Sequence, residues 1–229
     1  MASKASLMVV AHPDDETLFF GGLLLTTRSK RWTVVCVTDG NADGNGAARA
    51  QQFQAACKAL GVKRALHWDF PDIYEKRLDL DRLERRLGEL VDEIGKPAEV
   101  YTHGPLGEYG HPHHQDVCAA VHRAFAPKVP VWAPAYNCMP ARLAKLTPAQ
   151  YRTKCKILAG IYRAETRRFA HFLPATAVEG FVRHKPAEIE ALYGWIAHAR
   201  RPDPKQLVAY GWYLPYLEDS GGRVAPRPF

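Results

Sequence analysis

Continuous apolar runs alternate with amphipathic stretches through the first 134 residues of the chain. The runs at residues 7–11 and 32–38 are apolar or β-branched at nearly every position. Such continuity, in contrast to strict alternation, is typical of strands covered on both faces, as in parallel sheets. From residue 80 to 94 the aliphatic side chains instead recur at helical spacing, and Asp79 precedes them as a helix cap. We therefore expect strands at residues 7–11, 32–38, 65–69, 99–102 and 129–133, and helices at residues 14–28, 47–60, 80–94 and 115–125.

This order of elements predicts the α/β class, with an open, mostly parallel sheet, right-handed crossovers and helices on both faces. Beyond Pro134 the pattern weakens, and only helices near residues 148–158 and 187–198 are expected. We find no composition break, internal repeat or low-complexity tract there. The sequence therefore predicts a single domain over residues 1–229, with a core at about 6–134 and a C-terminal elaboration at about 135–229.

The composition and charge of the chain indicate which classes of protein it can belong to. A chain of 229 residues with 47% hydrophobic content can bury one sizeable core, and no apolar run approaches the ~18 residues of a membrane span. No signal-peptide pattern precedes the first strand, so we expect a cytoplasmic protein. The net charge of +7 is scattered and accompanies no nucleic-acid motif. We therefore expect no nucleic-acid partner, and leave open contact with an anionic substrate or a membrane surface and assembly into a homo-oligomer.

Five cysteines, with no CxxC pair among them, favour free thiols over a disulfide framework or a thiolate zinc site.

The chemistry concentrates where the first apolar run ends. Residues 12–16, HPDDE, place an imidazole and three carboxyl groups directly after a buried strand. Such charges are costly at that place unless something compensates them, and a divalent metal is the simplest compensation. The alternative is an ordinary helix start, in which Asp14 or Asp15 caps backbone amides.

A second polar cluster, residues 108–114 (EYGHPHH), follows the fourth predicted strand. Because functional groups of open α/β sheets gather at the carboxyl ends of strands, we expect the two clusters to meet. A zinc hydrolase needs three protein ligands, an open position for water and a base. His12, Asp15 and His114 supply a His2Asp ligand set, and Asp14 is then free to act as the general base.

Two further groups of the second cluster suit an amide hydrolysis. His111 stands in a loop restrained by Pro112 and is a candidate general acid for the leaving group. Tyr109 is a candidate donor of a hydroxyl proton to a developing oxyanion.

These residues also resemble a known family. Residues 11–16, AHPDDE, match the signature of the PIG-L/LmbE-type zinc-dependent N-deacetylases, and residues 111–114, HPHH, are similar to that family's HPxH motif. The segments Thr38-Asp39-Gly40, Leu60-Gly61 and Pro71-Asp72 recur at similar places, so the resemblance covers about residues 6–134.

The resemblance implies a Rossmann-like sheet and hydrolysis of the N-acetyl group of an N-acetylglucosamine-type amino sugar or its conjugate. It implies the same ligands, base and donors, and it adds Arg49 and Asp72 as residues that hold the sugar. Two positions depart from the family pattern. Gln52 stands where the family's Arg-x-x-Glu has its acid, and His113 stands where the HPxH motif often has Asp, which makes His113 an alternative ligand.

We therefore expect a metal-dependent hydrolase of a small-molecule N-acetylated amino sugar or glycoconjugate, with Zn2+ or Fe2+ bound. One alternative is an amide hydrolase for a non-sugar N-acyl substrate, and another is a sugar-binding module with a lapsed site. A dinucleotide-binding protein is not indicated, since no GxGxxG follows the first strand.

Overall fold

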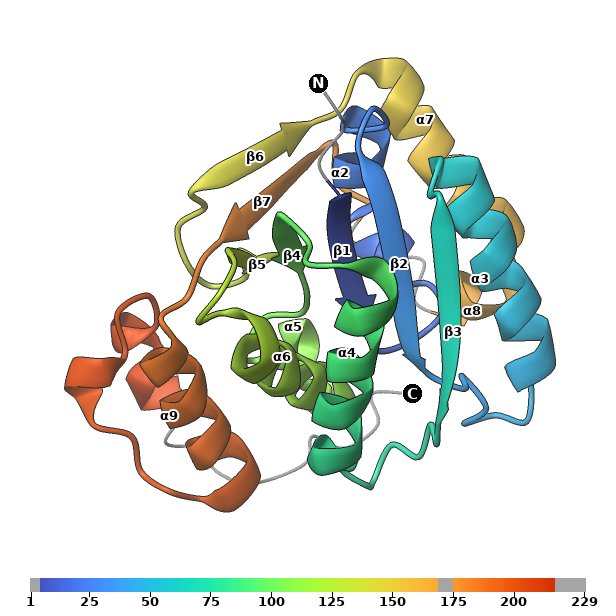
Figure 1. The fold of residues 1–229 in the computed structure, drawn as a ribbon. Helices are drawn as coiled ribbons and strands as arrows, with labels where there is room; N and C mark the ends of the chain where they lie inside the picture. Colours follow the sequence, from blue (N-terminus) through green and yellow to red (C-terminus); the bar gives the residue numbers. More distant parts are fainter. Residues whose placement is uncertain (1–4, 169–174, 217–229) are drawn as a thin grey trace. The chain divides into compact units, whose positions relative to one another are not determined.

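Figure 1 shows the computed structural model of the chain as a ribbon. It describes residues 5–168 and 175–216, so that residues 169–174 and 217–229 of the expected C-terminal elaboration lie outside the described residues. The described residues form two compact units, each assembled from two stretches of chain. Of the described residues, the first unit holds 5–73, 142–168 and 175–180, and the second holds 74–141 and 181–216.

Three parallel strands, in the order β3-β2-β1, run through the first unit. β1 pairs with β2 from Ala5 opposite Arg31 to Val10 opposite Cys36. Residues 7–10 of β1 are completely buried, as the continuous apolar run predicts. The elements of this part are β1 (Ala5–Val10), α1 (Asp15–Leu18), α2 (Gly21–Thr26), β2 (Arg31–Thr38), α3 (Gly46–Leu60) and β3 (Arg64–Phe70).

The single helix expected at residues 14–28 is divided into α1 and α2. The reason lies far along the chain, in Glu179. Its carboxylate accepts the backbone N–H groups of Gly22, at 2.6 Å, and Leu23, at 2.8 Å, and so caps the start of α2. A Cβ at Gly22 would lie 2.7 Å from the Glu179 carboxyl carbon and closer still to Cδ1 of Leu146, so a larger residue would force these side chains to shift.

The rest of the first unit comes from the C-terminal part of the chain, where the sequence pattern predicted only one helix of this unit. The helix expected near residues 148–158 begins at Pro148 behind a capping box of Thr147 and Gln150, and it passes into a π-helical turn. Directly after that turn, buried Tyr162 donates its hydroxyl to Glu16 at 3.0 Å. The elements here are β6 (Arg142–Lys145), α7 (Pro148–Lys156), η1 (Ile157–Ile161), α8 (Arg163–Thr166) and the start of β7 (Val178–Val182).

In the second unit β4 and β5 are parallel, and the end of β7 is antiparallel to β5, with Ala133 opposite Val182. Buried Asp116 anchors the histidine-bearing helix α6. Its carboxylate accepts the backbone N–H of Leu78 at 2.9 Å and the hydroxyl of Tyr193 at 2.8 Å. The elements are α4 (Leu80–Ile94), β4 (Glu99–Tyr101), α5 (Gly107–Gly110), α6 (Pro112–Phe125), β5 (Val131–Pro134), α9 (Pro186–His198), η3 (Pro204–Gln206) and η4 (Gly211–Tyr213).

The predicted fold class, an open and mostly parallel α/β sheet with helices, is confirmed. The described residues contain seven strands, of which β6 and β7 were not predicted. All five cysteines are free thiols, and Cys36, Cys57 and Cys118 are buried. Within residues 5–168 and 175–216, the helices are too short or too polar for any of them to cross a membrane.

Candidate metal centre and active site

The first cluster of functional side chains lies where β1 runs into α1 and comprises His12, Asp14, Asp15, Arg49 and Asp72. The histidine and the three acids are at most 7% exposed. All five belong to the first unit. Charged groups persist at such depth only when they are paired or hold a cation.

His12 lies between two carboxylates. Its Nδ1 is 3.3 Å from Oδ2 of Asp15, and its Nε2 is 3.5 Å from Oδ1 of Asp72. Burial alone would lower the pKa of His12, but the carboxylates of Asp72 and Asp15 outweigh it and raise the pKa to about 10. The surroundings of this imidazole therefore favour positive charge. An imidazole with neighbouring carboxylates is a donor set that fits Zn2+ or Fe2+, which would take the place of the proton.

Asp14 differs from its neighbour Asp15 in backbone conformation. Its φ of 117° is rare for a residue with a side chain. Glu16 stabilises this turn, because its Oε2 accepts the Asp14 backbone N–H at 3.1 Å. The Asp14 carboxylate lies 3.3 Å from Nη2 of Arg49. Burial raises the pKa of Asp14 well above its usual value, although Arg49 opposes the shift. A carboxyl group with a raised pKa is suited to accept a proton near neutral pH.

Arg49 and Asp72, named from the family resemblance, belong to the same cluster. Arg49 donates from Nη2 to the carbonyl oxygen of Pro13 at 2.7 Å, and its Nη1 lies 3.6 Å from Oδ2 of Asp72. Asp72 thus touches both the imidazole of His12 and the guanidinium of Arg49. The guanidinium links the loop after β1 to the loop after β3.

The second cluster belongs to the second unit and is organised by Glu108. Its Oε2 accepts from Nδ1 of His114 at 2.6 Å and from Nδ1 of His103 at 2.9 Å, and its Oε1 accepts the Gly104 backbone N–H at 2.7 Å. Burial alone would raise the pKa of Glu108, but the two histidines outweigh it and lower the pKa to about 2. Glu108 therefore stays ionised and acts as an acceptor only.

These bonds fix the two proposed histidines of α6 in opposite tautomers. His114 donates Nδ1–H to Glu108, so its Nε2 presents a lone pair, as a metal ligand must. His111 caps α6 and accepts the backbone N–H of His113 at its Nδ1, 3.2 Å away, so its Nε2 carries the proton. At Nε2, His111 is therefore a hydrogen-bond donor and His114 an acceptor.

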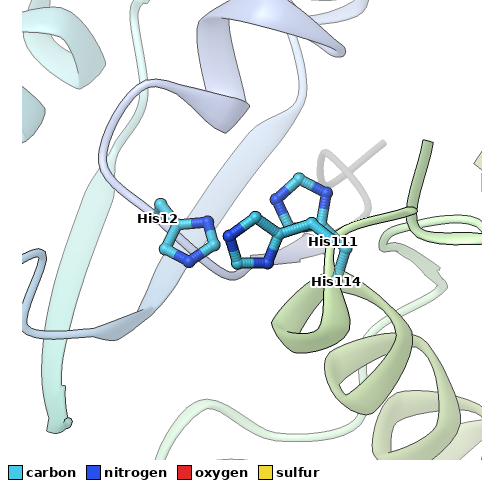
Figure 2. Close-up of side chains that lie close together, drawn as sticks. All are labelled: His12, His111 and His114. Atoms are coloured by element: carbon cyan, nitrogen blue, oxygen red, sulfur yellow. The ribbon is translucent and has the colours of Figure 1, made fainter. Parts of the chain in front are cut away.

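Figure 2 labels His111 and His114 at the start of α6 and His12 in the loop after β1. The rings of His111 and His114 are stacked, with centroids 4.8 Å apart. Tyr109, which is 58% exposed, places its ring edge-on to both. His113 forms a bond between its Nε2 and the carbonyl oxygen of Lys76 at 2.9 Å, so this nitrogen has a structural partner.

Sequence reasoning missed the roles of His103 and Glu108. Glu108 stands inside the EYGHPHH stretch, so the motif itself was the available signal. Its φ of 55° is uncommon for a residue with a side chain, and it turns the carboxylate toward His103 and His114.

The comparisons with known proteins cover both clusters. The family model described as GlcNAc-PI de-N-acetylase (PIG-L) matches residues 7–125. The chain belongs to this family. The 1D-myo-inositol 2-acetamido-2-deoxy-alpha-D-glucopyranoside deacetylase 1 of Saccharopolyspora erythraea is 30% identical, with 81% of this chain and 75% of the relative covered. The chain spans about half the length of the first curated relatives it matches.

Solved structures extend the PIG-L likeness to the fold. N,N'-diacetylchitobiose deacetylase from Pyrococcus horikoshii has a TM-score of 0.66 at 19% identity, covering 81% of this chain and 85% of that one. GalB, the 4-carboxy-2-hydroxymuconate hydratase from Pseudomonas putida, has a TM-score of 0.53 at 21% identity, covering 79% and 95%. At such identities the likeness shows the fold alone. The hydratase also shows that more than one reaction occurs on it.

Proposed function

We propose that this PIG-L family member is a metal-dependent hydrolase that removes the acetyl group from an N-acetylglucosamine-type amino sugar or its conjugate. The opposite tautomers of His111 and His114 carry the proposal. An amide hydrolase of this type needs both a lone pair for the metal and a proton for the leaving nitrogen. The hydrogen bonds at the start of α6 give His114 the free lone pair and His111 the proton.

In this proposal His12, Asp15 and His114 hold the metal, Zn2+ or Fe2+. The bound metal supplies Lewis-acid chemistry, since it lowers the pKa of water and polarises a carbonyl group. His12 and Asp15 are already in contact in the first unit, and His114 is oriented by Glu108 in the second. The proposal takes the acceptor nitrogen of His114 as the third ligand of a His2Asp set.

The remaining residues move protons. Asp14 takes a proton from the attacking water, whose oxygen forms a bond to the acetyl carbon. Tyr109 and Nε2 of His111 donate hydrogen bonds to the oxyanion of the tetrahedral intermediate. The C–N bond then breaks, and the leaving nitrogen takes a proton from His111 or from Asp14. The products are acetate and a free amine.

The sugar specificity is proposed from the family, with Arg49 and Asp72 as the residues that bind hydroxyl groups. A non-sugar N-acyl substrate stays as the alternative. A cytoplasmic location and assembly into a homo-oligomer likewise stay predictions.

Acetate release tests the proposal. Purified chain, reconstituted with Zn2+ or with Fe2+ under anaerobic conditions, is offered N-acetylglucosamine, its inositol and disaccharide conjugates, and a matched set of N-acetyl amines without a sugar. We expect acetate and an equal amount of amine from at least one amino-sugar conjugate, and much less with Asp14→Asn. Release from the non-sugar amides alone would favour the alternative, and binding without release would favour a lapsed site.

A further inference from the structure

Arg49 has a third acidic neighbour, which lies outside the segment that matches the family. Glu165 of α8 places its Oε2 4.0 Å from Nε of Arg49, and both side chains are buried to nearly nine-tenths. Both residues belong to the first unit. Among the described residues the buried Nε–H group of Arg49 has no hydrogen-bond partner, and the carboxylate of Glu165 forms an ion pair with it.

The three edges of the guanidinium therefore face three different acids. Nη2 lies 3.3 Å from Asp14, Nη1 3.6 Å from Asp72 and Nε 4.0 Å from Glu165. A guanidinium is planar and presents its donors in a fixed fork, so partners on all three edges determine its orientation. If the acid on the Nε edge is removed, the described residues supply no other acid on that side to balance Asp14 and Asp72, and besides these two acids the guanidinium keeps the hydrogen bond of Nη2 to the carbonyl oxygen of Pro13.

The helix that carries Arg49 offers no acid for this edge. Gln52 lies one turn further along α3, at the i+3 position that would suit an ion pair. It is a neutral amide, and its buried Oε1 has no hydrogen-bond partner within the part of the chain that the structure describes. The carboxylate beside Nε of Arg49 is instead that of Glu165, on α8.

We propose that Glu165 is a positioning residue, which fixes the orientation of Arg49 and through it the carboxylate of Asp14. The inference rests on the proposed function in one respect, the role of Asp14 as the base. Glu165 itself is neither a proposed metal ligand nor a proposed substrate-binding residue. Its effect on turnover passes through the guanidinium of Arg49.

The test compares three variants. Glu165→Gln keeps the shape of the side chain and removes its charge, and we expect kcat/KM to fall by about 10- to 100-fold, the size of effect that a misplaced active-site group produces. In the double variant E165Q/Q52E a carboxylate returns on α3, and we expect it to recover most of the loss. The matched control is Asp43→Asn, which removes the exposed ion pair that Asp43 forms with Arg168 at 2.7 Å and should leave kcat/KM within about two-fold.

A second readout does not depend on activity. The proton–nitrogen NMR signal of the Arg49 Nε–H group, assigned by its loss in Arg49→Lys, should shift and exchange faster with water in E165Q and return toward the wild-type values in E165Q/Q52E. If E165Q does not fold, Glu165→Asp takes its place, with a smaller shift in the same direction.

Unchanged kcat/KM in E165Q would overturn the inference, as would a loss of activity with an unchanged Arg49 signal or without rescue by Q52E. If the wild-type protein releases no acetate from any substrate, the proposed function fails, and the NMR comparison still decides whether Glu165 orients Arg49.

Discussion

Substitution of Glu108 by glutamine should weaken both metal binding and the fold. Oε2 of Glu108 accepts from His114 at 2.6 Å and from His103 at 2.9 Å, and its side chain is completely buried. In glutamine one of the two oxygens becomes an NH2 group, whose hydrogens would point at donors in either orientation: at the two histidine Nδ1–H groups, or at the Gly104 backbone N–H. In both cases His114 loses the negatively charged acceptor that orients its ring and holds its proton on Nδ1.

The size of the expected loss of stability follows from the pKa of Glu108, which is lowered from 4.5 to about 2 in the folded protein. A shift of this size corresponds to about 3 kcal/mol of stabilisation of the ionised group. The melting temperature of Glu108→Gln should therefore fall by roughly 6–12 °C. Loss of the carboxylate behind a metal-bound histidine typically costs about 10- to 100-fold in metal affinity.

The pH dependence has a definite sign. Because the pKa of Glu108 is lower in the folded protein, its contribution to stability is present above pH 4.5 and is lost as the pH falls from 4.5 toward 2. The difference in unfolding free energy between the wild type and Glu108→Gln should therefore shrink in this window.

Two measurements check these expectations: calorimetric titration of the metal-free protein with Zn2+, and urea unfolding between pH 3 and 7. Glu89→Gln is the control, because Glu89 is 62% exposed and its ion pair with Arg86 lies on the surface of α4. A Zn2+ affinity of Glu108→Gln equal to that of the wild type would refute the view that Glu108 orients a metal-binding His114.

Three further predictions concern other groups. Asp14→Asn should retain its metal in elemental analysis while turnover falls by about 10²- to 10⁴-fold; near-normal turnover would refute the base assignment. Glu179→Gln leaves the buried ammonium of Lys154, now 2.7 Å from Oε1 of Glu179, without its carboxylate, and should lower the unfolding free energy by about 3–5 kcal/mol in urea; an unchanged midpoint would contradict this. Burial lowers the pKa of His122 from 6.5 to about 4, so stability should fall by about 3 kcal/mol as the pH drops from 6.5 to 4. His122→Gln should flatten that profile, and an equally steep profile in the variant would argue against His122 as its source.

The fold could be predicted where local patterns decide it. The buried strands β1 and β2 appear in the sequence as continuous apolar runs, and α4 appears as a repeat of aliphatic residues behind the Asp79 cap. The break between α1 and α2 could not be predicted, because the cap that starts α2 is Glu179, which lies on β7. β7 itself carries no alternating or continuous apolar pattern strong enough to indicate a strand.

In the candidate site, too, some contacts could be predicted from the sequence and others could not. His12, Asp14 and Asp15 stand in one motif, and their contacts with one another or with near neighbours follow from it. The contacts that set their surroundings are long-range: Glu165 reaches Arg49 from α8, and Tyr162 reaches Glu16 from the end of a π-helical turn. Such pairs leave no periodicity in the sequence, because the fold alone brings them together.

The central proposal is that His12, Asp15 and His114 hold a single metal. The most direct measurement is the metal content of purified, Zn2+-reconstituted wild type, His12→Ala and His114→Ala, each with its melting temperature recorded to confirm folding. We predict about one Zn2+ per wild-type chain and loss of the metal in both variants, because each removes one of three ligands. A folded His114→Ala that still binds a full equivalent of Zn2+ with wild-type affinity would contradict the account.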